Sequence, residues 1–485
     1  VGHRARNHQS CSGRRGRSAD APALTLSEGA AETDTSPEAM TELTDELIWA
    51  IRAALDVGAS AEAAALTSTL HVADQADLLE QLHREQRETL ITETRDDLDP
   101  ELLTHLDETV RAEVLEFLSP EEVGAAIAQL ETDDAIDLLE DLDEPEQTAL
   151  LEALPIPDRV AVEQGLTYPE DSAGRLMQRQ LVAAPEFWTV GQTIDYLRVD
   201  EGLPDDFYDI YIVDPKFRPV GSIPLSRILR SKRNVHLNEL VMKELHTVPV
   251  DMDQEEVGFR FSQYDLVSAP VVDGDGRLLG VITIDDVVEV IEEEAEEDIL
   301  RLGGVRETDI FISPLKTSIR RFPWLLINLA TAVLASIVIA QFEGAISQIV
   351  ALAVLMPIVA SMGGNAGTQT LTVVVRALAV REVTAANAFR VLIKEAFAGG
   401  INGVLFMLAG LAVALFWYGD PQLGILFGLA MVVTLVAGVL AGVCIPLILD
   451  RLGFDPAVSS GVFLTTVTDV VGFFSFLGLA ALYLI

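Results

Sequence analysis

The sequence has little positive charge and almost no cysteine. Of its 485 residues, 33 are Lys or Arg and 75 are Asp or Glu, which gives a formal net charge of −42. This balance argues against nucleic acid as a partner, because phosphate binding requires a basic surface. The two cysteines, Cys11 and Cys444, lie far apart and in different surroundings. They indicate neither a disulfide framework nor a zinc site.

Signals for an enzyme and for secretion are missing as well. The sequence contains no P-loop, and no Ser/His/Asp or Cys/His set gathers within one domain, so we do not expect an enzyme. Residues 1–40 are rich in Arg, Ser and Ala and lack the apolar core of a signal peptide. We expect them to be disordered or to lie upstream of the true start, with Met40 as the initiator.

Acidic and apolar residues occupy different halves of the chain. Residues 1–310 hold 68 of the acidic and 25 of the basic residues, a net charge of −43, whereas residues 311–485 have a net charge of +1. The acidic half suits cations as partners. It also suits a general high-salt surface, since only five of the basic residues are Lys, so bulk acidity is weak evidence for metal binding.

Residues 41–167 are expected to form an all-α domain. Apolar residues recur there at spacings of three and four, and β-branched alternation is rare. Residues 77–82 match residues 137–142 at a shift of 60, which predicts short helices stacked into a small superhelix. Ser119 and Thr132 precede acidic residues in the manner of helix starts.

The next segment alternates between strand and helix patterns and contains a second repeat, at a shift of 59. Asp214 matches Asp273, and Gly221 matches Gly280. Each half reads as helix, strand, turn, strand, helix, which predicts an α/β fold. This pattern resembles a tandem pair of CBS domains, with the first at 168–240 and the second at 241–290.

The resemblance to CBS pairs implies an adenine-nucleotide site in the cleft between the two repeats. Thr283 and Asp286 match the ribose-binding pattern S/T-x-x-D of that family. The first repeat has Pro224 and Arg227 at the corresponding places. ATP is therefore a candidate ligand at one site at most.

An acidic segment follows the second repeat. We expect the last CBS helix to run directly into an acidic connecting helix, assigned to residues 291–318. On one helix Asp286, Glu289, Glu293 and Glu297 share a face, where like charges repel one another. Divalent cations that bridge this face would stabilise it. The alternative interpretation is a solvated connector helix.

Five charge-poor spans make up the expected α-helical transmembrane domain at 319–485. They cover residues 322–342, 344–375, 396–419, 421–449 and 456–485, and each is long enough to cross a bilayer once. All eight basic residues of this half precede the first span or lie in the two loops on the same side. The positive-inside rule then predicts a multi-pass plasma-membrane protein with cytoplasmic soluble domains and its C-terminus outside.

Asp469 is the only charged residue after Pro456, and it lies near the middle of the last span. An intramembrane carboxylate costs about 2.5–3.5 kcal/mol and marks a functional site by default. The alternative is a structural Asp that bonds to a neighbouring helix. In the second span, Pro357 and the Gly-rich residues 362–369 predict broken helix, which would expose Asn365 and Gln369 to water or a hydrated ion. Small-residue helix packing is the other interpretation.

The ligand chemistry narrows the choice of ion. Asp469, Thr465 and Thr468 offer only oxygen, and no Cys or His lies near them in sequence, which disfavours soft metals. One carboxylate is too little for a calcium cage, whereas Mg²⁺ usually keeps several of its waters. In a two-fold dimer, two copies of Asp469 would face each other and favour a divalent ion.

Over residues 41–485 the chain resembles the MgtE family of magnesium channels and transporters. The resemblance rests on Met-Gly-Gly-Asn-Ala-Gly-Thr-Gln at 362–369, Arg-Ala-Leu-Ala at 376–379, Thr-Thr-Val-Thr-Asp at 465–469 with Gly-Phe at 472–473, and the domain order. It implies a homodimer with a pore on the two-fold axis, lined by the second and fifth spans. It also implies that Asp469 and the backbone oxygen of Thr465 hold hydrated Mg²⁺.

The same resemblance implies a gate, in which cytosolic Mg²⁺ closes the pore through the connecting, or plug, helix. The matching acidic residues are Asp133 and Asp137 in the N domain, Asp253, Glu255, Asp265 and Asp286 in the second CBS domain, and Glu289, Glu294, Glu297 and Asp298 in the helix. The repeat offers two registers for the N-domain pair, and position 289 has Glu where Asp would also suit.

Two other functions stay open from the sequence. One is a broader permease for divalent ions such as Mn²⁺ or Co²⁺, or an ion-coupled carrier. The other is a membrane-anchored nucleotide sensor in which the CBS pair is the working part. The sensor hypothesis predicts that Asp469→Asn leaves function intact.

Overall fold

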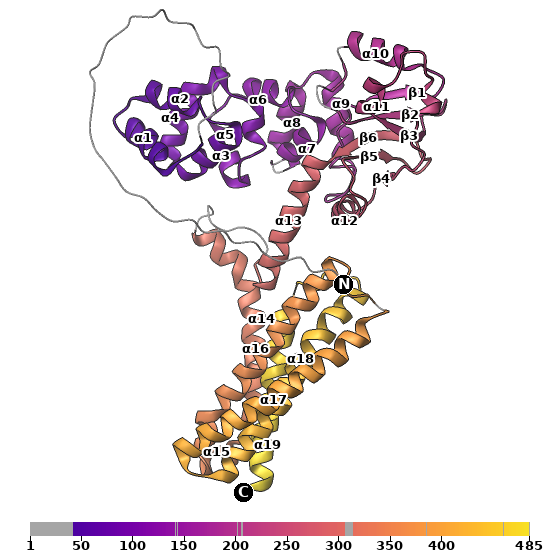
Figure 1. The fold of residues 1–485 in the computed structure, drawn as a ribbon. Coiled ribbons are helices and arrows are strands. Elements are labelled where there is room, and N and C mark those ends of the chain that lie inside the picture. Colours follow the sequence, from indigo (N-terminus) through magenta and orange to yellow (C-terminus); the bar gives the residue numbers. More distant parts are fainter. Residues whose placement is uncertain are drawn as a thin grey trace, which may run out of the picture.

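The computed structural model describes residues 42–484 except 141, 143, 201, 205, 206, 306–313, 385 and 459. The predictions for residues 1–40 and for residues 306–313 of the connecting segment therefore fall outside the described residues. Two soluble regions lie above an elongated helical bundle, and one helix, α13, joins them to it (Figure 1).

The first soluble region is built from short helices, as its apolar spacing predicts. They are α1 (Asp45–Asp56), α2 (Ser60–Thr67), α3 (Val72–Gln81), α4 (Arg84–Thr94), η1 (Arg95–Asp97), η2 (Pro100–Leu103), α5 (Glu108–Glu116), α6 (Pro120–Ile127), α7 (Thr132–Glu140), α8 (Glu144–Ala153) and α9 (Ile156–Gly165). The starts of α2, α3 and α4 recur 60 residues later as the starts of α6, α7 and α8, so the predicted repeat is confirmed. Ser119 forms a capping box with Glu122 at the start of α6.

The second soluble region contains two small sheets, each of three strands. Its elements are β1 (Ala183–Pro185), α10 (Val190–Val199), β2 (Asp209–Val213), β3 (Pro219–Pro224), α11 (Leu225–Arg230), η3 (Leu237–Glu239), β4 (Val248–Pro249), α12 (Gln254–Tyr264), β5 (Ser268–Val272) and β6 (Leu278–Thr283). In each sheet the first strand is parallel and the third antiparallel to the middle one.

The strand registers repeat as closely as the sequence does. Asp209 pairs with Pro224 in one sheet and Ser268 with Thr283 in the other, each partner being shifted by 59. This confirms the tandem α/β repeat. The chain crosses between the halves, however, because the segment around Ala173 and Met177 packs into the core of the second repeat and Gln178 pairs with Val281.

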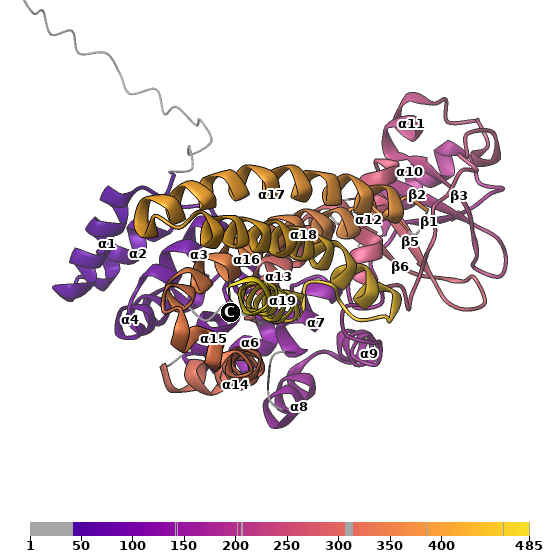
Figure 2. The ribbon, with the colours of Figure 1, turned by 90° about the horizontal axis from the view of Figure 1, so that it is seen from below.

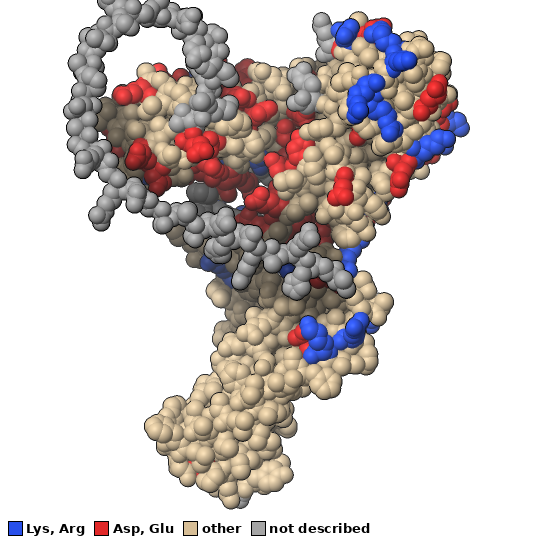
Figure 3. All heavy atoms as spheres, viewed as in Figure 1, with Lys and Arg blue, Asp and Glu red and all other residues tan. Residues whose placement is uncertain are grey.

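Helix α13 (Ile284–Leu302) is continuous from the second repeat into the acidic segment. Thr283 caps its start, and Asp286 completes a capping box there. The helix ends at Leu302, earlier than the predicted connecting helix, and Gly304 follows with a φ of +74° directly against Trp324. Acidic side chains gather over the first soluble region and around its junction with α13 (Figure 3).

Five helices are long and apolar enough to cross a membrane: α14 (Pro314–Ala340), α16 (Ala351–Ala379), α17 (Ala388–Tyr418), α18 (Pro421–Arg451) and α19 (Ser460–Tyr483). The short helix α15 (Glu343–Gln348) precedes α16. Figure 2 shows α17 and α14 at opposite edges, with α18, α16 and α19 between them. The predicted multidomain class, an all-α domain, an α/β CBS pair and five transmembrane helices, is confirmed.

The predicted break within the Gly-rich segment is wrong. The chain turns at Ile349 and Val350, before α16, and α16 then runs as a helix through Pro357 and residues 362–369. The glycines serve close packing instead. A Cβ on Gly438 would lie 2.4 Å from the carbonyl oxygen of Gly363, and one on Gly367 would lie 2.6 Å from Leu464. Without side chains at these positions, α16, α18 and α19 approach closely.

We therefore expect Gly438→Ala to force α16 and α18 apart and to lower the thermal unfolding midpoint in detergent. Overpacking of this kind costs about 1–3 kcal/mol. Gly400→Ala on α17 is the control, because nothing lies within 4 Å of its added Cβ. Equal midpoints for both variants would contradict the packing role of Gly438.

Candidate ion pathway and acidic cluster

Asp469 lies on α19 as a half-buried carboxylate. No hydrogen bond or ion pair joins it to another described residue, so the structure gives no support to the alternative of an Asp bonded to a neighbouring helix of this chain. An unpaired carboxylate within a membrane span requires water, a cation or a second chain beside it.

Small residues set the depth of Asp469 relative to α16. Gly364 of α16 lies next to Thr468 of α19, since a Cβ on Gly364 would be 3.8 Å from the Thr468 hydroxyl. The residues that follow these two in the sequence, Asn365 and Asp469, therefore lie at a similar level along the two helices. One helical turn further along α16, Gly367 lies against Leu464 of α19. Gln369 and Thr465, which are near these two residues in the sequence, lie close to the same level. Asn365, Gln369 and Thr465 are exposed in the single chain. The structure thus brings the predicted pore residues to one region of two neighbouring helices.

The threonines of α19 are engaged with their own helix. The Thr465 hydroxyl donates to the Gly461 carbonyl at 2.9 Å, and the Thr468 hydroxyl donates to the Thr465 carbonyl at 3.0 Å. A ligand that binds the Thr465 carbonyl oxygen must therefore compete with the Thr468 hydroxyl. Its proposed role toward a hydrated ion would be through water rather than by direct coordination.

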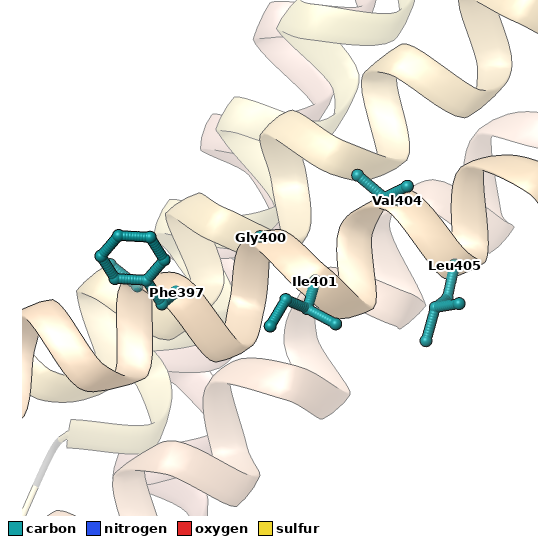
Figure 4. A pocket seen from close by; sticks show the side chains of 6 residues that line it. Phe397, Gly400, Ile401, Val404 and Leu405 are labelled. Carbon is teal, nitrogen blue, oxygen red and sulfur yellow. The ribbon is translucent and has the colours of Figure 1, made fainter.

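A surface groove on α17 does not belong to this region. It has a volume of about 540 Å³ and is lined only by Ala396, Phe397, Gly400, Ile401, Val404 and Leu405 (Figure 4). Such a lining offers no oxygen ligand for a cation. On a helix that crosses a membrane, this face suits lipid chains.

A second set of acidic residues lies where α7 meets α13. Asp133 is 8% exposed, and neither of its carboxylate oxygens has a hydrogen-bond partner among the residues that the structure describes. Burial, with repulsion from Asp286 and Asp134, raises its pKa well above the usual range. Burial and repulsion from Asp286 likewise raise the pKa of Asp134 to about 7. Burial raises the pKa of Asp286 to about 6, although hydrogen bonds from Thr283 oppose the shift.

The same face of α13 continues toward Asp137. Burial and repulsion from Asp137 raise the pKa of Glu293 to about 7, and burial also raises the pKa of Glu289. Asp137 itself accepts a hydrogen bond from Arg111 at 2.7 Å. Glu289 and Glu293 stay accessible to solvent, so an ion can reach this face.

The opposite face of α13 meets α12 of the second CBS domain. Gln254 donates a hydrogen bond to Glu294 at 2.9 Å. Burial and repulsion from Glu294 raise the pKa of Glu255, and burial raises the pKa of Glu294, with Asp253 adding to both. Asp253 caps α12 through the backbone N–H of Glu255. The predicted Asp253, Glu255 and Glu294 thus form one group.

The end of α13 lies against the membrane helices. Arg301 pairs with Glu297 and with Asp455, which precedes α19. Burial and repulsion from Asp455 raise the pKa of Asp298 to about 6. Leu302 packs on the cluster formed by Leu371, Val375, Ala441, Ala457 and Leu464. The acidic helix therefore ends directly on α16, α18 and α19.

Asp265 does not join these groups. It is exposed at the far end of α12 from Asp253, where it ends the helix with a φ of +52°. The 11 residues of α12 separate the two ends by about 16 Å. The sequence prediction also missed Asp134 and Asp455. Asp134 follows Thr132 at a predicted helix start, where an acid is typical of the first turn. The only sequence signal at Asp455 is that it is one of seven acidic residues within 311–485.

The residues at the predicted nucleotide site do not fit ATP in this arrangement. The cleft between the repeats has a volume of about 20 Å³, far below the 300–1,000 Å³ typical of ligand pockets. Tyr211 and Ser268 hydroxyls hydrogen-bond across it at 2.7 Å, and Ser268 donates to Asp209 at 3.1 Å. The hydroxyl of Thr283 donates to Asp286 at 2.7 Å, so the ribose-binding pair is already joined.

Within the described ranges, no three His, Cys, Asp or Glu side chains are already arranged as a metal site. The carboxylates instead approach in pairs across the interfaces of α13, with pKa values raised by burial and by one another. A multivalent cation between them would remove this repulsion, with water completing its coordination.

Comparison with known proteins gives the class. A family model described as a divalent cation transporter matches residues 356–479, which include α19 through Leu479 and most of α16. A model of the MgtE intracellular N domain matches residues 70–171, and a CBS domain model matches residues 237–293. The bundle is that of a membrane protein of the divalent cation transporter class.

The individual relatives identify the family. The chain is 36% identical over 322 residues to the magnesium transporter MgtE of Thermus thermophilus, covering 65% of this chain and 71% of the relative. It is 32% identical over 317 residues to that of Enterococcus faecalis, covering 65% and 70%. The chain belongs to the MgtE family. A solved cytosolic domain of the Mg²⁺ channel MgtE in complex with ATP is 31% identical, at a TM-score of 0.47, over 50% of this chain and 99% of that one.

The raised carboxyl pKa values predict a pH dependence in divalent-free buffer. The carboxylates of Asp134, Asp286 and Glu293 bind protons more tightly when α7 and α13 are together than when they are apart. The contact is therefore stable at low pH and weakens as the pH rises through about 6 to 7. Protease protection of the soluble half in EDTA should be greater at pH 5 than at pH 8.

Asp133→Asn with Asp134→Asn is the control, since this pair should flatten the pH profile. Mg²⁺ at pH 8 should restore protection to the wild type. The same cleavage rate for the wild type at both pH values would contradict the electrostatic account.

Proposed function

We propose that this protein transports Mg²⁺ across the cell membrane as a homodimer, past Asp469. The supporting observation is the half-buried carboxylate of α19, which has no partner among the described residues and lies at the depth of Asn365. The relatives' names as magnesium transporters support the choice of ion. The protein is not proposed to be an enzyme, because transport requires no bond to be made or broken.

Selection follows from what one carboxylate per chain can do. Mg²⁺ gives up water reluctantly, so a wide site with one acid and neutral oxygen groups suits the hydrated ion. Two copies of Asp469 across a two-fold axis would attract a divalent ion more strongly than a monovalent one. Asn365, Gln369 and the Thr465 carbonyl would then bind the outer face of its water shell.

The orientation follows from the basic residues. Lys316, Arg320 and Arg321 lie at the start of α14, and the other basic residues of this half lie at the ends or connections of α16, α17 and α18 nearest the soluble domains. The positive-inside rule places this side in the cytoplasm. The soluble domains would then sample cytosolic Mg²⁺, and the C-terminus would lie outside.

We also propose that cytosolic Mg²⁺ closes the pore. On one side of α13, Asp286 and Glu289 face Asp133 and Asp137 of α7. On the other side, Glu294 faces Asp253 and Glu255 at the start of α12. Glu297 and Asp298 lie near the end of α13. Without a cation these acids repel, and Mg²⁺ between them would hold α7, α12 and α13 together. Because Leu302 and Arg301 end on the membrane helices, ordering α13 would hold those helices closed.

The transport proposal predicts that Asp469→Asn abolishes rescue of a Mg²⁺-auxotrophic strain. The substitution keeps the size of the side chain and removes the charge that attracts the divalent ion. Asp450→Asn, at the exposed end of α18, should rescue like the wild type.

Equal rescue by Asp469→Asn and the wild type would overturn the pore assignment and favour the nucleotide sensor. Uptake of Mn²⁺ or Co²⁺ as fast as Mg²⁺ through the wild type would favour the broader permease.

The gate predicts that joint substitution of Asp286, Glu289, Glu294 and Glu297 by Ala removes Mg²⁺-dependent protease protection of the soluble half. The variant has lost the acids that the ions bridge, so its cleavage rate should be nearly independent of Mg²⁺. Substitution of four exposed N-domain acids, Glu85, Glu88, Glu144 and Glu152, by Ala is the matched control. If the α13 variant showed the same Mg²⁺-dependent protection as the wild type, the proposed Mg²⁺ gate would be wrong.

A further inference from the structure

The turn between α16 and α17 holds an arginine in an unusual backbone conformation. Arg381 has a φ of +55°, in the left-handed region that favours glycine. Its backbone N–H donates to the Leu378 carbonyl at 2.9 Å, which closes the end of α16. Arginine occupies a position where glycine would be less strained, and this points to a role for the arginine side chain.

The Arg381 side chain reaches α12 of the second CBS domain. Its guanidinium pairs with Glu256 and lies 4.3 Å from the centre of the Phe259 ring. Glu256 also accepts a hydrogen bond from Arg260 at 3.0 Å. Burial of Glu256 alone would raise its pKa, but the two arginines outweigh this effect and lower it. Arginine suits this place because it can pair and stack at once.

The turn that carries Arg381 is fixed to the membrane bundle. Val383 is buried among Ala377, Ala388 and neighbouring side chains of α16, α17 and α18, and its N–H donates to the Ala377 carbonyl at 2.9 Å. A pull on Arg381 is therefore transmitted to the end of α16. This helix also carries Asn365 and Gln369.

The other side of α12 faces the acidic helix. Glu255, next to Glu256 in sequence, lies near Glu294 of α13, and Gly258 of α12 lies against Ile291. Helix α12 therefore lies between α13 and the Arg381 turn. A change at the α12–α13 interface has a direct route to α16 that does not pass through Leu302 at the end of α13.

We propose that the Arg381 turn is a docking surface for α12, through which the second CBS domain holds the pore helix α16 independently of the end of α13. This inference rests on the proposed Mg²⁺ gate for its functional consequence. The surface fits a partner that offers one carboxylate and one aromatic ring a helical turn apart, as Glu256 and Phe259 do.

The test is a charge exchange in the full-length protein, reconstituted in liposomes. Arg381→Glu should raise the Mg²⁺ concentration that closes the pore on the order of fivefold, the lower range of coupling between sites. Glu256→Arg should act in the same direction, and the double exchange should return the threshold toward that of the wild type. Arg390→Glu, an exposed charge on α17 in the same part of the bundle, should leave the threshold unchanged.

A second variant separates docking from folding. Arg381→Gly removes the side chain and suits the left-handed backbone, so the bundle should unfold at the wild-type temperature or above while the closing threshold still rises. Wild-type thresholds in Arg381→Glu and Arg381→Gly would overturn the proposal, as would a double exchange that restores nothing.

Cross-linking keeps failure of this proposal distinct from failure of the gate. In a variant with Cys11 and Cys444 replaced by Ser, Ser262→Cys and Glu382→Cys should be joined by a bifunctional thiol reagent, because these exposed positions lie beside the contact and leave Arg381, Glu256 and Phe259 in place. If the two cysteines are joined but Mg²⁺ has no effect on transport by the wild type, the gate is rejected and the contact between α12 and the Arg381 turn is supported. Failure to join under closing conditions would overturn the docking surface itself.

Discussion

Repulsion between carboxylates across the faces of α13 is the constraint on which the soluble half depends. The protein buries Asp133 with no partner for either oxygen and places Asp286 next to it. Burying such groups together is unfavourable unless they bind protons or a cation. The Gln254–Glu294 hydrogen bond between α12 and α13 opposes the repulsion on the other face of α13. The arrangement of the domains is therefore conditional on solution conditions.

The membrane half solves a different problem. The middle parts of its helices carry almost no charge, and their association relies on close backbone approach at Gly363, Gly367 and Gly438. Gly363 and Gly367 occupy the same turns of α16 as Asn365 and Gln369. One face of the Gly-rich segment of α16 packs against α18 and α19 through its glycines. The other face leaves Asn365 and Gln369 exposed.

The sequence predicted most of the architecture because its repeats are short and regular. The shift of 60 fixed the succession of α2, α3 and α4 on α6, α7 and α8, and the shift of 59 fixed the strand registers. The break in the second span was mislocated because Pro357 and the glycines are compatible with a helix whose neighbours pack closely. Local propensity favoured a turn, and tertiary packing decided otherwise.

The candidate site was less predictable than the fold. Helical spacing placed Asp286, Glu289 and Glu293 on one face, but spacing cannot show what lies opposite. The partners are Asp133 and Asp134 from α7. Helical spacing does not link α7 to α13, and only the family resemblance placed Asp133 with these residues. Asp265 shows the converse, because it belongs to the same domain as Glu255 yet lies at the far end of α12. Such pairings come from three-dimensional packing alone.

Leu302 sets a resting bias on the junction that has nothing to do with charge. Its partly buried side chain packs on apolar residues of three membrane helices, and withdrawing it into water costs a part of the roughly 1.5–3 kcal/mol that full burial of a Leu contributes. On the proposed gate, this term favours the shut arrangement even when no ion is bound, so the ions need supply only the remainder. A larger or smaller side chain at position 302 would then change the fraction of pores that are open without bound ion, and no ion ligand would be altered.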